Sequence, residues 1–302
     1  MIRFLVFSDL HYDDVEDGDK RIDYILSNAR SRQLDFIVSL GDLCKPTEEN
    51  RKVLEKFNSL EVPVYTVIGN HETDECTLSE ITEFYSMKNA YYAVLCNGYK
   101  LIFVNTCYLS EGGAEKAYYK KNFKQRSSIY PIVPLDEIQW LQDELSDGTK
   151  SIIFSHHSFV NEFAKRGVAN RTSIQELIRG KPVLLCLNGH DHGDGFSCVD
   201  GVPYMTVNSA NYAWLGAQIT SSEVLMEKYS YLQGMLQYKQ AMSTYIEIDD
   251  DEIRIFGVEG DYLSVTPDDI GLYDYKWNGV SVKPQISSHR ISLYETTALK
   301  QH

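Results

Sequence analysis

Short runs of apolar residues, rich in β-branched and aromatic side chains, recur along the chain at strand length. The early runs alternate with segments in which apolar residues have helical spacing, namely Asp19–Arg32, Thr47–Leu60 and Leu135–Leu145. This alternation predicts βαβ units with a mostly parallel inner sheet, whereas the later strands follow one another closely and are predicted to be antiparallel. The predicted strands are Ile2–Phe7, Phe36–Leu40, Val62–Ile68, Tyr91–Leu95, Leu101–Asn105, Ser151–Phe154, Val183–Leu187, Pro203–Val207, Thr244–Ile248 and Ile253–Val258.

Two segments interrupt this alternation. Ser110–Pro134 is rich in Gly, Lys and Tyr and has no clear period, whereas Tyr212–Ala241 has a helical pattern of apolar residues. Insertions of this kind are often loops or caps over a site, and a surface helix packed on the body is the alternative for the second. We expect one domain over residues 1–265, with insertions at about 110–134 and 212–241, and a C-terminal extension over residues 266–302.

Composition and charge narrow the possible classes of protein. The 302 residues include 29 basic and 43 acidic side chains, for a formal net charge of -14, which argues against binding to nucleic acid or to an anionic membrane. A small anionic substrate remains compatible, because bound metal ions can set the local charge of a site. The six cysteines form no CxxC pair, and neither a signal peptide nor a membrane-spanning run is evident. We expect a cytoplasmic protein of unknown oligomeric state that has no membrane partner.

Polar side chains capable of binding metals follow five of the predicted strands directly. Since ligands bind at the carboxyl ends of strands in open α/β sheets, these side chains are expected to share one site. The glycines among them allow sharp turns and a close approach of the backbone. Any one of these motifs is common, and a hydrogen-bonded structural histidine is the usual alternative. The five stretches are Ser8-Asp9-Leu10-His11, Gly41-Asp42, Gly69-Asn70-His71-Glu72, Ser155-His156-His157 and Asn188-Gly189-His190-Asp191-His192.

The residue types in these stretches indicate transition metals. Mixed carboxylate and imidazole ligands suit Zn, Mn, Fe or Ni better than Mg or Ca. The candidates outnumber the ligands of one tetrahedral ion and fit two ions with one carboxylate between them. Two such ions act as a clamp for in-line displacement at phosphorus and generate a hydroxide at neutral pH. The candidate ligands are Asp9, His11, Asp42, Asn70, His156, His190 and His192.

In their order and spacing these motifs resemble the calcineurin-like metallophosphoesterase family, whose pattern is DxH, GD, GNH[ED], a lone or paired His, and GHxH. The resemblance covers about residues 1–210 and implies an α/β fold, a ββ sandwich of mixed sheets flanked by helices. It also implies the ligand sets. Asp9, His11 and His192 would hold one metal, Asn70, His156 and His190 the other, and Asp42 would bridge them.

The resemblance further implies that His71 is a catalytic residue that binds no metal and protonates the leaving oxygen or stabilises the phosphate. The family pattern favours His156 over His157 as ligand, since neighbouring side chains on an extended segment face opposite ways. Many members have an Asp at the position of Lys45, which pairs with this histidine. A lysine cannot accept the imidazole N–H, so either Asp74 or another acid orients His71, or His71 is a weaker acid. His157, Glu72 and Asp74 are candidates for contacts around the ligands or the substrate.

The expected function is a binuclear metal-dependent phosphoesterase that hydrolyses phosphodiester or nucleotide-type substrates by attack of a hydroxide on phosphorus. Pro134-Leu135-Asp136, Gln139-Trp140-Leu141 and Ser155-His156-His157 resemble the branch of cyclic-nucleotide phosphodiesterases and manganese-dependent ADP-ribose pyrophosphatases, and the GHDHGDG stretch at Gly189–Gly195 is similar to the latter. A phosphomonoesterase is the alternative, and a non-catalytic interaction protein that retains the fold is a further one. The substrate would be a small phosphate ester. Aromatic residues that could stack on a base, or only pack, are Tyr91, Tyr92, Tyr108, Tyr118, Tyr119 and Trp214.

Overall fold

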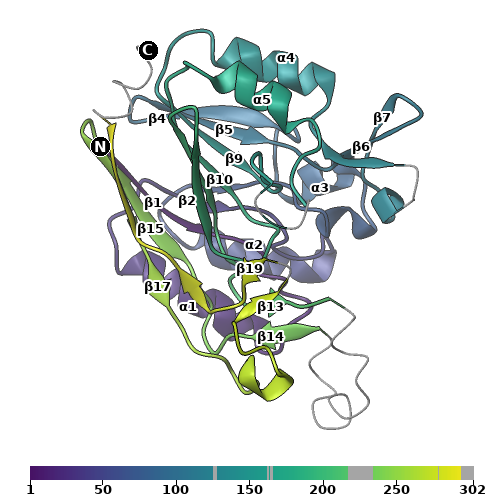
Figure 1. Ribbon diagram of the computed structural model, residues 1–302, viewed down its shortest axis with the longest axis vertical. Helices are drawn as coiled ribbons and strands as arrows, with labels where there is room; N and C mark the ends of the chain where they lie inside the picture. Colours follow the sequence, from purple (N-terminus) through teal and green to yellow (C-terminus); the bar gives the residue numbers. More distant parts are fainter. Residues whose placement is uncertain (125–127, 162, 164–165, 217–233, 278, 294–302) are drawn as a thin grey trace.

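The computed structural model describes residues 1–124, 128–161, 163, 166–216, 234–277 and 279–293. Two six-stranded mixed sheets pack face to face, with helices on both outer faces (Figure 1). This arrangement confirms the predicted ββ sandwich flanked by helices. In the first sheet the strand order is β21-β16-β15-β1-β2-β3, and in the second it is β11-β12-β10-β9-β5-β4.

The first sheet is built from the two ends of the chain. Parallel pairing joins β1 to β2 and β2 to β3, and antiparallel pairing joins β1 to β15, β15 to β16 and β16 to β21. The strands are β1 (Ile2–Phe7), β2 (Phe36–Ser39), β3 (Val64–Thr66), β15 (Thr244–Ile248), β16 (Glu252–Phe256) and β21 (His289–Ser292).

The second sheet comes from the middle of the chain. Its centre is parallel, with β9 between β5 and β10, and antiparallel strands β4 and β11 form its edges. Its strands are β4 (Tyr92–Cys96), β5 (Tyr99–Val104), β9 (Ser151–Ser155), β10 (Val183–Asn188), β11 (Gly195–Val199) and β12 (Val202–Thr206).

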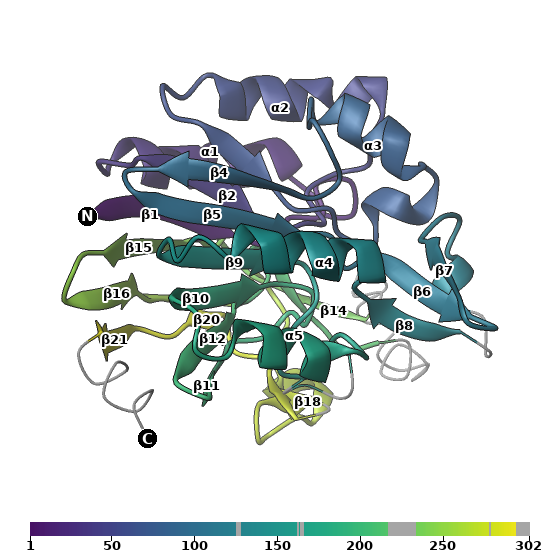
Figure 2. The ribbon, with the colours of Figure 1, turned by 90° about the horizontal axis from the view of Figure 1, so that it is seen from above.

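Alternating side chains of the inner strands fill separate cores. Phe4 and Val6 of β1 pack between the sheets, whereas Leu5 and Phe7 face the helices on the outside, as the period of two requires. Helices α1 (Gly18–Arg30) and α2 (Arg51–Asn58) cover the first sheet, and α4 (Leu135–Glu144) and α5 (Arg171–Ile178) cover the second (Figure 2). Helix α3 (Leu78–Phe84) packs at the side, and short 3-10 turns lie at 48–50, 72–74, 122–124 and 268–270.

The ten predicted strands and three predicted helices are all present, Ile2–Phe7 and Thr244–Ile248 with the predicted ends and the others with shifted ends. Helices α3 and α5 and strand β11 are among the elements that were not predicted. The described part of the segment 110–134, which has no clear period in sequence, forms most of a three-stranded sheet of order β7-β6-β8. Its strands are β6 (Tyr108–Glu111), β7 (Ala114–Ala117) and β8 (Ile129–Ile132).

The helical interpretation of 212–241 is wrong at both of its ends. The antiparallel strands β13 (Tyr212–Trp214) and β14 (Met235–Gln237) pair there, and residues 217–233 lie outside the described residues. Leu236 and Tyr238 are both fully buried in the core between the sheets. Their spacing of two residues is that of a strand, which the longer apolar pattern concealed.

The described residues beyond 265 pack against the domain. Strand β21 is hydrogen-bonded to β16 as an edge strand of the first sheet, and β20 (Gln285–Ile286) pairs with β17 (Val258–Glu259). A small hairpin, β18 (Lys276–Trp277) with β19 (Val280–Ser281), lies between them in sequence. Among the described residues, no helix has the length and apolar character needed to span a bilayer.

Candidate metal centre

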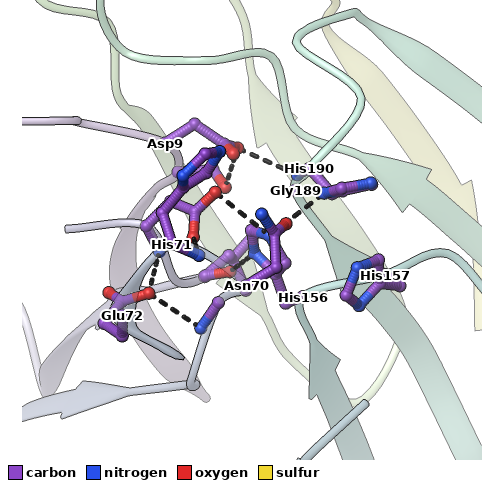
Figure 3. A network of polar contacts seen from close by, with 12 residues as sticks. Asp9, Asn70, His71, Glu72, His156, His157, Gly189 and His190 are labelled. Atoms are coloured by element: carbon purple, nitrogen blue, oxygen red, sulfur yellow. Dashed lines mark hydrogen bonds and ion pairs between the residues drawn. The ribbon is translucent and has the colours of Figure 1, made fainter. Parts of the chain in front are cut away.

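The polar stretches that follow β1, β2, β3, β9 and β10 meet at one edge of the sandwich (Figure 3). The first three strands belong to one sheet and the last two to the other, so the site lies where the carboxyl ends of both sheets converge. All seven candidate ligands come together there. His190 is partly buried, and the other six are buried.

Asp9, His11 and His192 form the first cluster. The Nε2 atoms of His11 and His192 are 3.2 Å apart, and Asp9 Oδ1 lies 3.4 Å from His192 Nε2 and 3.9 Å from His11 Nε2. These three atoms face a common point, as ligands of one ion do.

Asn70, His156 and His190 form the second cluster. His156 Nε2 lies 3.2 Å from Asn70 Oδ1 and 3.2 Å from His190 Nδ1. This arrangement offers one amide oxygen and two ring nitrogens to a shared position. His190 therefore presents Nδ1, whereas His156 presents Nε2.

Asp42 stands between the two clusters. Its Oδ2 atom is 3.7 Å from His11 Nε2 and 3.4 Å from His156 Nε2. Its other oxygen, Oδ1, accepts the backbone N–H of His71 at 2.8 Å. One carboxylate oxygen thus faces both ligand sets while the other is held by the chain.

Backbone carbonyls fix which ring nitrogen of two histidines faces the site. His156 Nδ1 donates to Leu40 O at 2.8 Å, and His192 Nδ1 donates to Tyr212 O at 3.1 Å. Each bond places the ring proton on Nδ1 and leaves the Nε2 lone pair free, which is the usual arrangement behind metal-binding histidines.

Electrostatics favour ionised carboxylates at the centre. Burial opposes the charge of Asp9, but the neighbouring His192 outweighs it and lowers the pKa of Asp9 to about 2. For Asp42, His156 and His71 likewise outweigh burial and hold the pKa well below its usual value. Burial, followed by His157 and Arg166, lowers the pKa of His190, so this imidazole stays neutral.

The donor set fits metal ions. Asp9 Oδ1 is fully buried and accepts no hydrogen bond from any described residue, although it points at two imidazole nitrogens. An ionised carboxylate oxygen left in this way is costly unless a cation neutralises it. Ligand atoms from both clusters lie within 4.8 Å of one another in groups of three.

The backbone around the site is strained. Asp9, His11, Asp42, His190 and His192 all have φ between 46° and 68°, a region that non-glycine residues seldom adopt. Such strain concentrates at functional sites, where the surrounding structure enforces it. Because the turns are this tight, each ligand emerges directly at the end of its strand.

Two glycines allow the strand ends to approach. A Cβ atom at Gly69 would lie 2.2 Å from Asp42 Oδ1, and one at Gly189 would lie 1.7 Å from Ser8 Oγ and 2.7 Å from Asp9 Oδ2. Any side chain at either position would therefore displace a candidate ligand. Close approach is thus the function of these glycines, as the sequence predicted.

His71 has an acidic partner despite the lysine in the family's aspartate position. Its Nδ1 atom lies 3.0 Å from Asp74 Oδ2, and its side chain is 48% exposed. Burial disfavours the cation, but Asp42 and then Asp74 outweigh it and raise the pKa of His71 to about 9. The lysine at position 45 left open whether Asp74 or another acid orients His71, or whether His71 is a weaker acid. The contact described above supports Asp74 as the orienting acid. Lys45 itself donates its backbone N–H to Asp13 at 2.7 Å.

Glu72 is buried and joins two of the strand ends. Its carboxylate accepts the N–H groups of Asp42, Leu43 and Gly69 at 2.8–3.1 Å and the hydroxyl of Tyr85 at 3.1 Å. It therefore holds the turns after β2 and β3 together without facing the candidate ligands.

His157 lies closer to the centre than the alternation of side chains predicted. A ring nitrogen of His157 comes within 4.8 Å of those of His156 and His190, because β9 ends at Ser155 and the extended geometry ends with it. Its Nδ1 atom is 2.7 Å from Thr106 Oγ1.

Arg166, Thr106 and Tyr212 also reach the site, and sequence reasoning did not assign them to it. Arg166 donates to the carbonyl oxygen of His190 at 2.8 Å and stacks over Trp214, with 5.2 Å between its Cζ and the ring centroid. The ring of Tyr212 lies 4.6 Å from that of His192. None of the three belongs to a recognisable motif, so only their position in space places them here.

Two cavities open from the centre and share His11, Asp13, Asp14, Asp42 and His71. The smaller has a volume of about 230 Å³, and the larger about 980 Å³. Of the aromatic residues considered for stacking, Tyr118 and Trp214 line the larger cavity. Tyr91 instead packs on Trp140, and Tyr92 donates to Thr66 O.

The chain belongs to the calcineurin-like phosphoesterase family, whose model matches residues 2–194. This membership confirms the resemblance stated from the motifs and indicates a metal-dependent phosphoester hydrolase. None of the curated proteins matches the chain in sequence.

Solved structures with the same fold include a dimetal phosphatase from Danio rerio, 15% identical, with a TM-score of 0.61 over 88% of this chain and 99% of that one. Another is GAP50, the anchor in the inner membrane complex of Plasmodium, 14% identical, with a TM-score of 0.61 over 99% and 94% of the two chains. A third is the purple acid phosphatase PPD1 from yellow lupin (Lupinus luteus) seeds, 12% identical, with a TM-score of 0.50 over 95% of this chain and 53% of that one. At these identities the similarity shows the shared fold alone.

Proposed function

We propose that this protein is a two-metal hydrolase of phosphate diesters or nucleotide-type substrates. Asp9, His11 and His192 would hold one ion and Asn70, His156 and His190 the other. The observation that carries the proposal is the position of Asp42, whose Oδ2 atom faces His11 at 3.7 Å and His156 at 3.4 Å. A carboxylate oxygen shared in this way is what a pair of neighbouring ions requires.

Two bound ions supply charge neutralisation at the phosphoryl oxygens and an ionised water molecule at neutral pH. The chain's own groups do the rest. His71, oriented by Asp74, donates a proton to the leaving oxygen. Arg166, whose Nε atom lies 3.6 Å from Asp191 Oδ1, lines the larger cavity and offers a guanidinium group to an anionic substrate there. Mn, Fe, Zn and Ni all suit this donor set.

The preference for diesters rests on the space around the centre. A diester carries a substituent on each side of the phosphorus, and the two cavities share His71 and Asp42 but are otherwise lined largely by different residues. A phosphomonoesterase needs room on one side alone. Monoester hydrolysis is therefore the second candidate activity.

The test compares bis-p-nitrophenyl phosphate with p-nitrophenyl phosphate after loading with Mn²⁺. Asp42→Asn should lose metal and activity, whereas His71→Gln should keep metal and lose diesterase activity at least about a hundredfold. His289→Gln, a change at a histidine outside the site, is the control and should behave as the wild type. Activity towards the monoester alone would make the protein a phosphatase, and failure to bind metal would refute the proposal.

A non-catalytic interaction protein is the remaining alternative, and the anchor GAP50 is one protein with this fold. The described site argues against it, because every candidate ligand position is occupied by a residue able to bind metal. Two bound ions without hydrolysis of any mono- or diester tested would favour it.

A further inference from the structure

We propose that the larger cavity binds a second phosphate group of the substrate, in addition to the phosphate that is hydrolysed. Lys124 and Arg166 supply the positive charges that hold this group. The inference rests on the proposed function and deepens it. Among phosphate diesters, the protein would prefer those that carry a further phosphate on one of their two arms.

The two cavities differ in the charged residues that line them. The residues common to both cavities include the carboxylates Asp13, Asp14 and Asp42. Among the described residues that line the larger cavity alone, Lys124 and Arg166 are the charged side chains other than histidines. Both are positive, in a chain whose formal net charge is -14. An anion in this part of the larger cavity therefore meets two cations and no carboxylate from the described lining.

Lys124 has no counter-charge among the residues that the structure describes. Two other lysines of the same segment are paired, since Lys116 Nζ lies 2.7 Å from Glu111 Oε2 and Lys121 Nζ lies 3.3 Å from Asp74 Oδ2. Lys124 is exposed and lines the larger cavity. A lysine ammonium group in this position can bind an anion without first breaking an ion pair.

The turn that carries Lys124 is held in place by hydrogen bonds. The Asn122 side chain accepts the backbone N–H of Tyr119 at 3.1 Å and donates to the carbonyl oxygen of Ala117 at 2.9 Å. The backbone N–H of Lys124 donates to Lys121 O at 3.1 Å. The backbone of Lys124 is therefore fixed beside the cavity, and only its side chain has to be ordered when an anion binds.

Arg166 is fixed so that one edge of its guanidinium group stays open. Its Nη2 atom donates to the carbonyl oxygen of His190 at 2.8 Å, and the group stacks on Trp214. The Nη1 atom has no hydrogen-bond partner among the described residues. The Nε atom lies 3.6 Å from Asp191 Oδ1, so Asp191 offsets part of the charge of Arg166. Guanidinium N–H groups with a fixed direction are suited to phosphate oxygens.

The phosphate that is hydrolysed does not account for both cations. A diester has one negative charge at phosphorus, and that phosphorus would lie at the metal centre, where two bound ions neutralise charge. A phosphate monoester adds a charge of about -1.5 to -2 at neutral pH, which matches Lys124 together with a partly balanced Arg166. The cavity volume of about 980 Å³ is at the upper end of the usual range for ligand sites and leaves room for this second group.

Two diesters that differ in one phosphate test this proposal. We would compare thymidine 5′-(p-nitrophenyl phosphate) with its 3′-phosphorylated form, using Mn²⁺-loaded protein, and follow the release of p-nitrophenol from both. The wild type should have a kcat/KM at least about tenfold higher for the 3′-phosphorylated diester, as one charge-assisted hydrogen bond predicts. Because the leaving group is the same, a ratio within about twofold would overturn the proposal.

Variants of the two cations test which residues produce this preference. Lys124→Gln should reduce the ratio to about threefold or less, whereas Lys124→Arg, which keeps the charge, should hold it above about fivefold. Arg166→Gln should also reduce the ratio, when compared at equal metal content. Lys116→Gln is the matched control, since Lys116 is an exposed lysine of β7 that lines neither cavity, and it should keep the wild-type ratio. A tenfold ratio that persists in Lys124→Gln and in Arg166→Gln would overturn the proposal.

A binding measurement separates the assignment from turnover. By isothermal titration calorimetry, thymidine 3′,5′-bisphosphate should bind the wild type and Lys116→Gln at least about fivefold more tightly than thymidine 5′-monophosphate. In Lys124→Gln the preference should fall below about twofold. Hydrolysis of both diesters by the wild type, together with equal affinity for the two nucleotides, would refute the second phosphate site and leave the proposed function intact. Failure of the wild type to hydrolyse any diester would refute the proposed function instead.

Discussion

At the scale of single residues, His71 contacts Asp74, whereas the family resemblance implies an aspartate at the position of Lys45 as its partner. Asp74 contacts His71 Nδ1 at 3.0 Å and Lys121 Nζ at 3.3 Å. Because His71 immediately precedes the 3-10 turn Glu72–Asp74 and Asp74 ends it, the pair is formed locally. The contact between His71 and Asp74 therefore does not depend on Lys45 or on the turn after β2.

Asp74→Asn should slow the hydrolysis of esters with alkyl leaving groups about tenfold more than that of nitrophenyl esters, since alkoxides need the acid most. The acid form of His71 is lost as pH rises through its pKa, and the Asp74 carboxylate raises that pKa. The alkaline limb of the pH–rate profile should therefore move to lower pH in the variant. Lys121→Ala is the control, and its alkaline limb should not move to lower pH. Equal slowing of both ester types would show that His71 is no leaving-group acid.

At the scale of elements, helix α4 is connected to the site through one buried carboxyl group. Glu137 Oε1 accepts the N–H of Asn105 at 2.6 Å, and Oε2 has no partner among the described residues. The next residue, Thr106, contacts His157 at 2.7 Å. Burial holds the pKa of Glu137 well above its usual value, so the group is neutral in the folded protein.

Glu137→Gln should therefore change how stability depends on pH. In the wild type the unfolded chain ionises Glu137 above its ordinary pKa while the folded chain does not, so stability falls as pH rises. Glutamine does not ionise, so the Glu137→Gln variant does not lose stability in this way as pH rises. Its free energy of unfolding relative to the wild type should rise by up to about 3 kcal/mol between pH 6 and pH 8.

Urea unfolding in the presence of a chelator measures this difference, because metal release then does not contribute. Asp143→Asn, at an exposed position of the same helix, should show no such change with pH. If Glu137→Gln differed from the wild type equally at both pH values, Glu137 would be ionised in the folded state.

The elements also show what sequence could and could not predict. Asp9, Asp42 and His190 follow their strands directly, so a strand pattern with its polar ending was enough to place them. Arg166 and Thr106 occur in irregular segments whose path depends on packing. The strands β13 and β14 are only three residues each, too short for a period of two to stand out from the surrounding apolar pattern.

At the scale of the whole molecule, the C-terminal segment supports the turn that carries His190 and His192. Asp194 accepts the backbone N–H of Ser287 at 3.0 Å, and it also accepts the Ser287 hydroxyl. A Cβ atom at Gly193 would lie 2.0 Å from Val280 Cγ1. The described residues beyond 265 thus pack directly against the turn that carries His190 and His192.

Asp194→Ala tests whether this packing matters for the site. Loss of the hydrogen bonds to Ser287 should lower the free energy of unfolding by about 1–3 kcal/mol. It should also lower the metal retained after dialysis, because the turn that carries two candidate ligands loses its support. At saturating Mn²⁺ the kcat should stay within twofold of the wild type, since Asp194 lines neither cavity. Asp250→Ala, which removes the exposed ion pair with Lys150, is the matched control and should change neither quantity measurably. Reduced stability with unchanged metal retention would mean that the C-terminal segment stabilises the sandwich without positioning the ligands.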